Sequence, residues 1–258
     1  MMNLVLACHE EDTSLSNGFS MNESELSVEL GLKGMPAAAE NVMISRDIEL
    51  ALLTGGRVHF CHVSTARGVE LIRRAKKDGA KVTAETAPHY FILDETAVTE
   101  YDTSAKMSMP LRKQEDIKGL LEGLADGTID CVASDHAPHE EDSKRVAFGD
   151  ASLGILGLQT TVPLLLEKVR EGALSLERAI ASVTSDARAC YGLEQVSLEK
   201  GSVADISVID QESKITFGKE HNLSLSSNSP FFGRELQGLA RFTVVAGRKV
   251  FDSKGLYS

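Results

Sequence analysis

Several features that define other protein classes are missing from this 258-residue sequence. No apolar run approaches the roughly 18–20 residues that a membrane-spanning helix needs. Basic residues are the minority, with 27 Lys and Arg against 38 Asp and Glu and a formal charge of −11. This balance argues against a general nucleic-acid or anionic-membrane binder, because both bind through excess positive charge. The start of the chain lacks the basic segment of a signal peptide, and we expect a cytoplasmic protein.

Cysteine is also sparse, and the four residues never form a Cys-x-x-Cys pair: Cys8, Cys61, Cys131 and Cys190. Such wide spacing gives little support for a zinc ribbon or a disulfide framework. We therefore expect buried free thiols in a reducing cytosol. The sequence contains no internal repeat and no P-loop or dinucleotide-binding pattern, so phosphate binding is not indicated.

Short apolar runs alternate with longer amphipathic segments along most of the chain. The runs predict strands over residues 4–8, 58–61, 81–85 and 129–133, and the segments predict helices over 36–54, 66–77, 114–125, 156–170 and 176–183. This alternation is typical of parallel βαβ units with right-handed crossovers. A closed βα barrel needs eight strands, and four are convincing here. Beyond residue 200 the pattern changes to short β segments and a hairpin that turns at Ala246 and Gly247.

Ionisable residues follow three of the predicted strands. His9, His62 and Asp135 each come just after an apolar run. In βα barrels the carboxyl ends of the strands carry the chemistry, and imidazole and carboxylate are the usual ligands of a catalytic zinc. These residues predict a metal-assisted hydrolytic site in which Asp135 moves the proton. The alternative is that each is an ordinary hydrogen-bonded residue at a strand end.

Other histidines and two loops are weaker candidates. His139 lies on a loop that could face a substrate, and His89 is similar but less clearly placed, whereas His59 and His221 are interpreted as structural or surface residues. Residues 106–112 are either a site segment or simply a loop before the helix that begins near residue 114. The glycine-rich residues 148–158 offer backbone amides to a polar ligand.

Taken together, these motifs resemble the long, bacterial-type dihydroorotases of the amidohydrolase superfamily. The most specific stretch is Ser-Asp-His-Ala-Pro-His at 134–139, with Lys144 and the Gly-Ile-Leu-Gly-Leu-Gln-Thr run at 154–160. Further matches in order and spacing are residues 9–12, 62–65, 87–89, 109–112, 228–231 and 245–248. The resemblance extends from about residue 4 to residue 251.

The resemblance implies a zinc-dependent cyclic amidase that interconverts N-carbamoyl-L-aspartate and dihydroorotate in pyrimidine synthesis, with one or two zinc ions and a bridging hydroxide. It implies His9 and His62 as metal ligands and Asp135 as both metal ligand and proton-transfer group. It places substrate contacts at Ser108, His139, Leu153 and Gly154. The implied fold is a partial TIM-type (β/α) barrel, corresponding to the family's C-terminal half, over residues 1–192, with a C-terminal β module over 193–258.

The sequence also departs from the family pattern. It has no His-x-His pair and no neighbouring arginine, so we expect the chain to lack the family's N-terminal part and half of its metal site. Ser108 replaces the usual Asn, and Ser occurs at this place in hydantoinases. We therefore expect little dihydroorotase activity from the chain alone.

Two alternatives follow from these departures. One is a non-catalytic, dihydroorotase-like partner of aspartate transcarbamoylase. The other is a related hydantoinase or allantoinase. In any of these cases, four strands without closure leave a sheet edge and an apolar face exposed, so we expect the chain to recruit a complementing fragment, form an oligomer or aggregate.

Overall fold

The computed structural model describes residues 4–254. Residues 1–3 and 255–258, at the outer ends of the two predicted domains, lie outside the described residues. The strands are β1 (Val5–Cys8), β2 (Met21–Asn22), β3 (Gly34–Met35), β4 (Arg57–Phe60), β5 (Val82–Thr86), β6 (Cys131–Val132), β7 (Ile206–Thr216), β8 (Glu235–Val245) and β9 (Arg248–Asp252). The longer helices are α3 (Ala38–Thr54), α4 (Ala66–Lys77), α6 (Gln114–Asp126), α8 (Thr161–Arg170), α9 (Leu176–Ser182) and α10 (Ser185–Cys190). Short helices are α1 (Thr13–Ser16), α2 (Glu25–Glu29), α5 (Pro88–Ile92) and α7 (Glu141–Lys144), with 3₁₀ turns at Glu95–Val98, Thr103–Ala105 and Lys219–His221.

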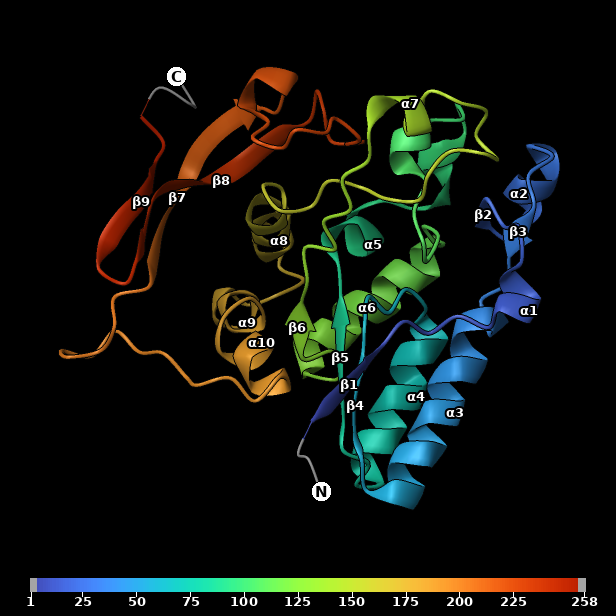
Figure 1. Ribbon diagram of the computed structural model, residues 1–258, viewed down its shortest axis with the longest axis horizontal. Coiled ribbons are helices and arrows are strands. Elements are labelled where there is room, and N and C mark those ends of the chain that lie inside the picture. Colours follow the sequence, from blue (N-terminus) through green and yellow to red (C-terminus); the bar gives the residue numbers. More distant parts are fainter. Residues whose placement is uncertain (1–3, 255–258) are drawn as a thin grey trace.

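A four-stranded parallel sheet in the order β1-β4-β5-β6 organises the first two thirds of the chain. Helices α3, α4 and α6 connect its successive strands and pack side by side, α3 on α4 and α4 on α6 (Figure 1). The bounds of β1, β4 and β5 lie within one residue of their predicted ranges, and β6, at Cys131–Val132, lies inside the predicted range 129–133. The partial (β/α) barrel is therefore confirmed.

The core of this part lies between the sheet and these helices. Val58 and Phe60 of β4 are buried there, as are Val69 and Ile72 of α4. Side chains alternate between the two faces of a strand, so His59 of β4 projects from the opposite face, toward the inside of the incomplete barrel. The edge strand β1 is poorly covered, and its Leu6 is 64% exposed.

The C-terminal part is a three-stranded antiparallel sheet in the order β7-β8-β9, which packs on α8 through β8 (Figure 1). The predicted hairpin turn is confirmed: β8 ends at Val245, β9 begins at Arg248, and both turn residues have positive φ, 49° at Ala246 and 77° at Gly247. Two positive φ values match the twist of the flanking strands, and glycine adopts one at no steric cost.

Two sequence predictions differ from the structure. The helix predicted over residues 156–170 begins only at Thr161, because Ile155 pairs with His136 in a β-bridge and the Leu156 N–H donates to the Asn228 carbonyl. The first short β segments predicted beyond residue 200 form one long strand, β7, over Ile206–Thr216. The division into domains at residue 192 stays a prediction.

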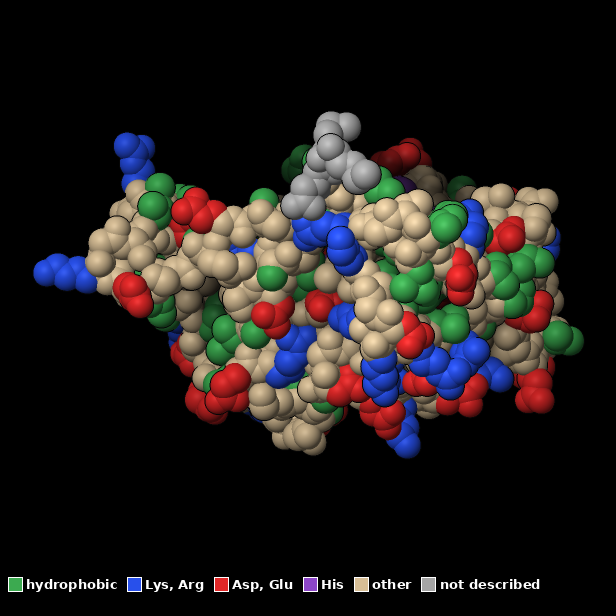
Figure 2. Space-filling view, turned by 90° about the horizontal axis from the view of Figure 1, so that it is seen from below, with side chains coloured by type: hydrophobic (Ala, Val, Ile, Leu, Met, Phe, Trp, Pro, Cys, Tyr) green, Lys and Arg blue, Asp and Glu red, His purple; other side chains and the backbone are tan. Residues whose placement is uncertain are grey.

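The surface seen from below mixes charges of both signs (Figure 2). Basic and acidic side chains interleave there, and ion pairs on α4 and α6 include Arg74 with Glu70 and Arg73 with Asp126. No helix between residues 4 and 254 has the length and apolar character that crossing a bilayer requires.

Candidate metal and substrate site

The three predicted metal ligands lie at one edge of the parallel sheet. His9 follows β1 directly, His62 comes two residues after β4, and Asp135 comes three residues after β6. Because parallel strands share a direction, their carboxyl ends meet at the same edge. His62 and Asp135 both have left-handed backbones, with φ of 39° and 43°. Non-glycine residues in this region cost about 1–3 kcal/mol each, and such strain clusters at functional sites.

The two imidazoles are in direct contact. His9 Nδ1 lies 2.9 Å from His62 Nε2, and the rings meet edge to face with centroids 4.7 Å apart. The other nitrogen of His9, Nε2, is held 2.8 Å from Glu11 Oε2. A carboxylate behind a ligand histidine is a recurrent feature of metal sites, because it fixes the ring orientation and raises its basicity.

Asp135 is half-buried beside His89, and its buried Oδ2 lies 3.3 Å from His89 Nε2. Among the described residues, neither of these two buried atoms has a partner with hydrogen-bond geometry. Burial raises the pKa of Asp135, but the contact with His89 and the charges of His89, His62 and His9 outweigh it, so the net pKa is lowered. Burial lowers the pKa of His62, which keeps the imidazole neutral as a metal ligand must be.

These residues fit a bound metal ion in their donor chemistry. Two adjacent imidazole nitrogens and a buried carboxylate oxygen that makes no hydrogen bond are ligands that zinc accepts. The three ligand atoms are less tightly gathered than those of two other groups among residues 4–254. His59, Cys61 and Glu85, and likewise Cys8, Glu10 and Asp47, have ligand atoms that all lie within 4.8 Å of one another.

Three of the predicted substrate residues, His139, Leu153 and Gly154, lie on the loops that follow β6, and Ser108 lies on the segment before α6. His139 Nε2 lies 2.8 Å from the Leu153 carbonyl, and the Gly154 N–H donates to the Lys106 carbonyl at 2.9 Å. The second contact brings residues 153–154 beside the segment that carries Ser108. A Cβ at Gly154 would lie 2.7 Å from both the Ala137 carbonyl oxygen and the His139 ring, so this close approach requires glycine.

Two residues of the site were given no individual role from the sequence. Asn228 joins the loops, because its Nδ2 donates to the Ala137 and Gly154 carbonyls at 2.8 and 2.9 Å and its Oδ1 accepts from His139 N–H at 3.1 Å. It also lines a cavity of about 280 Å³ with His139 and Lys144. Glu11, which holds the His9 ring through Nε2, is the second. His89, only weakly favoured in the sequence, is the direct neighbour of Asp135.

Comparison with known proteins identifies the family of this chain. The sequence pattern of the amidohydrolase family matches residues 20–250. The chain belongs to the amidohydrolase family. It is 49% identical to a dihydroorotase of Endomicrobium trichonymphae over 254 residues, covering 98% of this chain and 60% of that protein. A dihydroorotase of Syntrophotalea carbinolica is 49% identical over 245 residues, covering 95% of this chain and 58% of the relative.

Solved structures of the amidohydrolase fold agree with the architecture. The L-hydantoinase of Arthrobacter aurescens superimposes with a TM-score of 0.87 at 28% identity, covering 96% of this chain and 57% of that one. The dihydropyrimidinase of Brevibacillus agri gives a TM-score of 0.85 at 24% identity, covering 98% and 58%, and shows the fold alone. The chain therefore spans about three fifths of the length of the proteins it matches.

Proposed function

We propose that this chain forms part of a dihydroorotase-type cyclic amidase, which interconverts N-carbamoyl-L-aspartate and dihydroorotate in the cytoplasm during pyrimidine synthesis. The contact between His9 Nδ1 and His62 Nε2 at the carboxyl edge of the sheet is the observation that carries the proposal. The relatives named dihydroorotase, at 43–49% identity, support the choice of substrate.

In this proposal His9, His62 and Asp135 hold zinc, one or two ions in the complete site. The metal would supply an acidified water and polarise the amide carbonyl. The chain's own residues orient the metal ligands and transfer the proton. Glu11 orients the His9 ring through Nε2, and Asp135 carries the transferred proton on a carboxylate that stands beside His89.

The same proposal assigns the substrate to the loops beyond β6. His139 and the backbone of Leu153 and Gly154 offer polar groups that Asn228 holds together. Ser108 contributes a hydroxyl, which has one donor and is shorter than an amide side chain, so it reaches a substrate less directly than Asn. Buried hydrogen bonds from Asn228 keep these loops fixed before a ligand arrives.

We further propose that full activity needs a second polypeptide segment that supplies the remaining metal ligands and a cation for the substrate carboxylate. An oligomer or a complementing fragment is the candidate source of these groups, whereas aspartate transcarbamoylase is the candidate partner of a non-catalytic chain. The open edge at β1, with Leu6 64% exposed, supports association.

Co-expression tests the proposal directly. The 258-residue chain is produced with the part of the Endomicrobium relative that lies outside their match, and hydrolysis of dihydroorotate is measured with zinc. The relative's own matching part, assembled in the same way, is the positive control. We expect turnover from the mixed pair and its loss in D135N. A mixed pair that assembles like the control but leaves dihydroorotate intact would contradict the proposal.

A hydantoinase is the second candidate. Its support is the 28% identity to L-hydantoinase over 96% of this chain, together with Ser108. Supplying hydantoin and dihydroorotate to the same assembled pair distinguishes a hydantoinase from a dihydroorotase. Turnover of hydantoin alone would favour the hydantoinase.

A further inference from the structure

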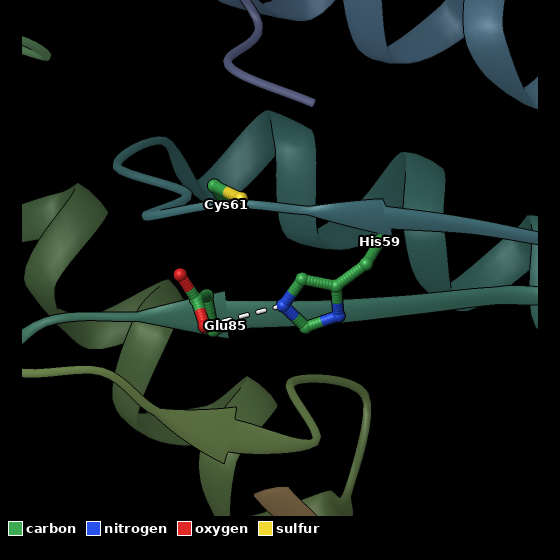
Figure 3. Close-up of side chains that lie close together, drawn as sticks. All are labelled: His59, Cys61 and Glu85. Atoms are coloured by element: carbon green, nitrogen blue, oxygen red, sulfur yellow. Dashed lines mark ion pairs between the residues drawn. The ribbon is translucent and has the colours of Figure 1, made fainter. Parts of the chain in front are cut away.

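A group of side chains with metal-ligand chemistry lies on the inner face of the sheet and contains none of the three proposed catalytic ligands, although Cys61 directly precedes His62. His59 and Cys61 come from the same side of β4 and its extension, two residues apart, and Glu85 comes from the neighbouring strand β5. Figure 3 shows the three side chains pointing toward one another between the two strands. None of them takes part in the function proposed above.

The spacing of these side chains suits a small cation. Their ligand atoms all lie within 4.8 Å of one another, and His59 Nε2 is 3.2 Å from Glu85 Oε2. Two ligands at roughly 2.0–2.1 Å from a tetrahedral zinc ion are about 3.3 Å apart. The imidazole and the carboxylate therefore already stand at the separation that a shared zinc ion would impose.

The environment of His59 adds an independent argument. Its side chain is fully buried, and Nδ1 lies 2.8 Å from Thr83 Oγ1. In the tautomer in which Nδ1 donates to that hydroxyl, the lone pair of Nε2 is free to bind a metal. Within residues 4–254 this buried Nε2 faces Glu85 Oε2 at 3.2 Å as an ion pair but makes no contact with hydrogen-bond geometry. Buried polar atoms are rarely left in this state, and a metal-bound histidine typically anchors its other nitrogen in this way.

We propose that His59, Cys61 and Glu85 form a second site, for one thiophilic divalent cation such as zinc, that joins β4 to β5. Nitrogen, sulfur and carboxylate oxygen are together a zinc-type donor set. The side chain of Glu85 is 12% exposed, which leaves a path for the ion and for a water as fourth ligand. This inference does not depend on the proposed function, because it involves no residue of that site.

Other thiols provide matched controls for the test. Cys190 Sγ lies 3.7 Å from Cys131 Sγ, so this pair could also attract a thiophilic metal. Cys8 belongs to the more acidic group with Glu10 and Asp47, in which Asp47 Oδ1 is already engaged by Arg46 Nε at 2.6 Å. Only Cys61 is a ligand in the proposed site.

Cobalt(II) is the probe, because a cobalt–thiolate bond gives a charge-transfer band in the near ultraviolet. The full chain is titrated as wild type, C61S, C8S, C190S and the H9N/H62N double variant, with circular dichroism as a check of folding. We expect the charge-transfer band in the wild type, C8S, C190S and H9N/H62N. In C61S the band should be absent, and the chain should bind one cobalt ion fewer than the wild type. E85Q should retain the fold and bind cobalt at least about tenfold more weakly.

Three results would overturn the proposal: no charge-transfer band in the wild type, a band that persists in folded C61S, or a band that disappears in C190S instead. If C61S does not fold, E85Q decides, since unchanged cobalt affinity in this variant would also overturn the proposal. Zinc should raise the melting temperature of the wild type more than that of E85Q, because an ion that binds only the native state stabilises it.

Discussion

The buried ion pair behind the His62 loop gives the sharpest prediction for stability. Glu40 of α3 and Arg112 are each 1% exposed in their side chains, and Glu40 Oε2 lies 3.5 Å from Arg112 Nη2. Glu40 also accepts from the backbone N–H groups of Ser64 and Thr65, at 2.9 and 3.3 Å, and from both hydroxyls. This carboxylate therefore fixes the loop that directly follows His62.

The substitution E40Q keeps the shape of the side chain but removes its charge and replaces an acceptor with a donor. Removing one partner of a buried pair leaves the other charge uncompensated, which costs about 3–5 kcal/mol. For a chain of this size each kcal/mol lowers the melting temperature by roughly 2–4 °C, so E40Q should lose about 6–20 °C. Urea denaturation followed by circular dichroism gives the free energy of unfolding.

The matched control is E122Q on α6. Glu122 faces Lys118 at 3.8 Å with both side chains well exposed, and such exposed helical pairs contribute about 0.3–0.5 kcal/mol. A free energy of unfolding for E40Q within about 1 kcal/mol of the wild type would refute the reasoning. It would mean that the buried network adjusts around the lost charge.

Three further predictions concern the substrate loops and the sheet edge. G154A should lower the free energy of unfolding by about 1–3 kcal/mol, because its Cβ would lie 2.7 Å from the Ala137 carbonyl oxygen. The control G149A, whose Cβ would have its nearest atom 3.8 Å away, should unfold like the wild type in the same urea titration. K144M should lose about 2 kcal/mol, because Nζ donates to the Thr103, Lys106 and Ser152 carbonyls and only the first two keep a backbone N–H donor; a wild-type urea midpoint would contradict this. L6K places a charge on the exposed edge strand β1 and should therefore reduce self-association, measured by sedimentation velocity. A wild-type chain that sediments as a stable monomer would contradict this prediction.

Much of the parallel sheet could be predicted because its signal is local. Residues 58–61 and 129–133 are short apolar runs, and the helices between strands end at glycines such as Gly55 and Gly127, which cap α3 and α6 with positive φ. Those signals depend on neighbours within one turn. The positions of His9, His62 and Asp135 followed from the same strands.

The remaining features depend on contacts between residues far apart in the sequence. Asn228 lies 91 residues beyond Ala137, whose carbonyl it binds, and nothing in its own segment indicates this. Helix α8 begins at Thr161 and not at the predicted residue 156, because residues 155–156 pair with His136 and Asn228. His59 was interpreted as structural or surface, and only its contacts with Thr83 and Glu85 reveal a possible ligand.

A zinc anomalous difference map from crystals of the 258-residue chain grown with zinc tests the central claim most directly. Our account predicts an anomalous peak bonded to His9 Nδ1 and His62 Nε2 at the carboxyl edge of the sheet. Density showing these two nitrogens still in direct contact, with no anomalous peak beside them, would contradict it.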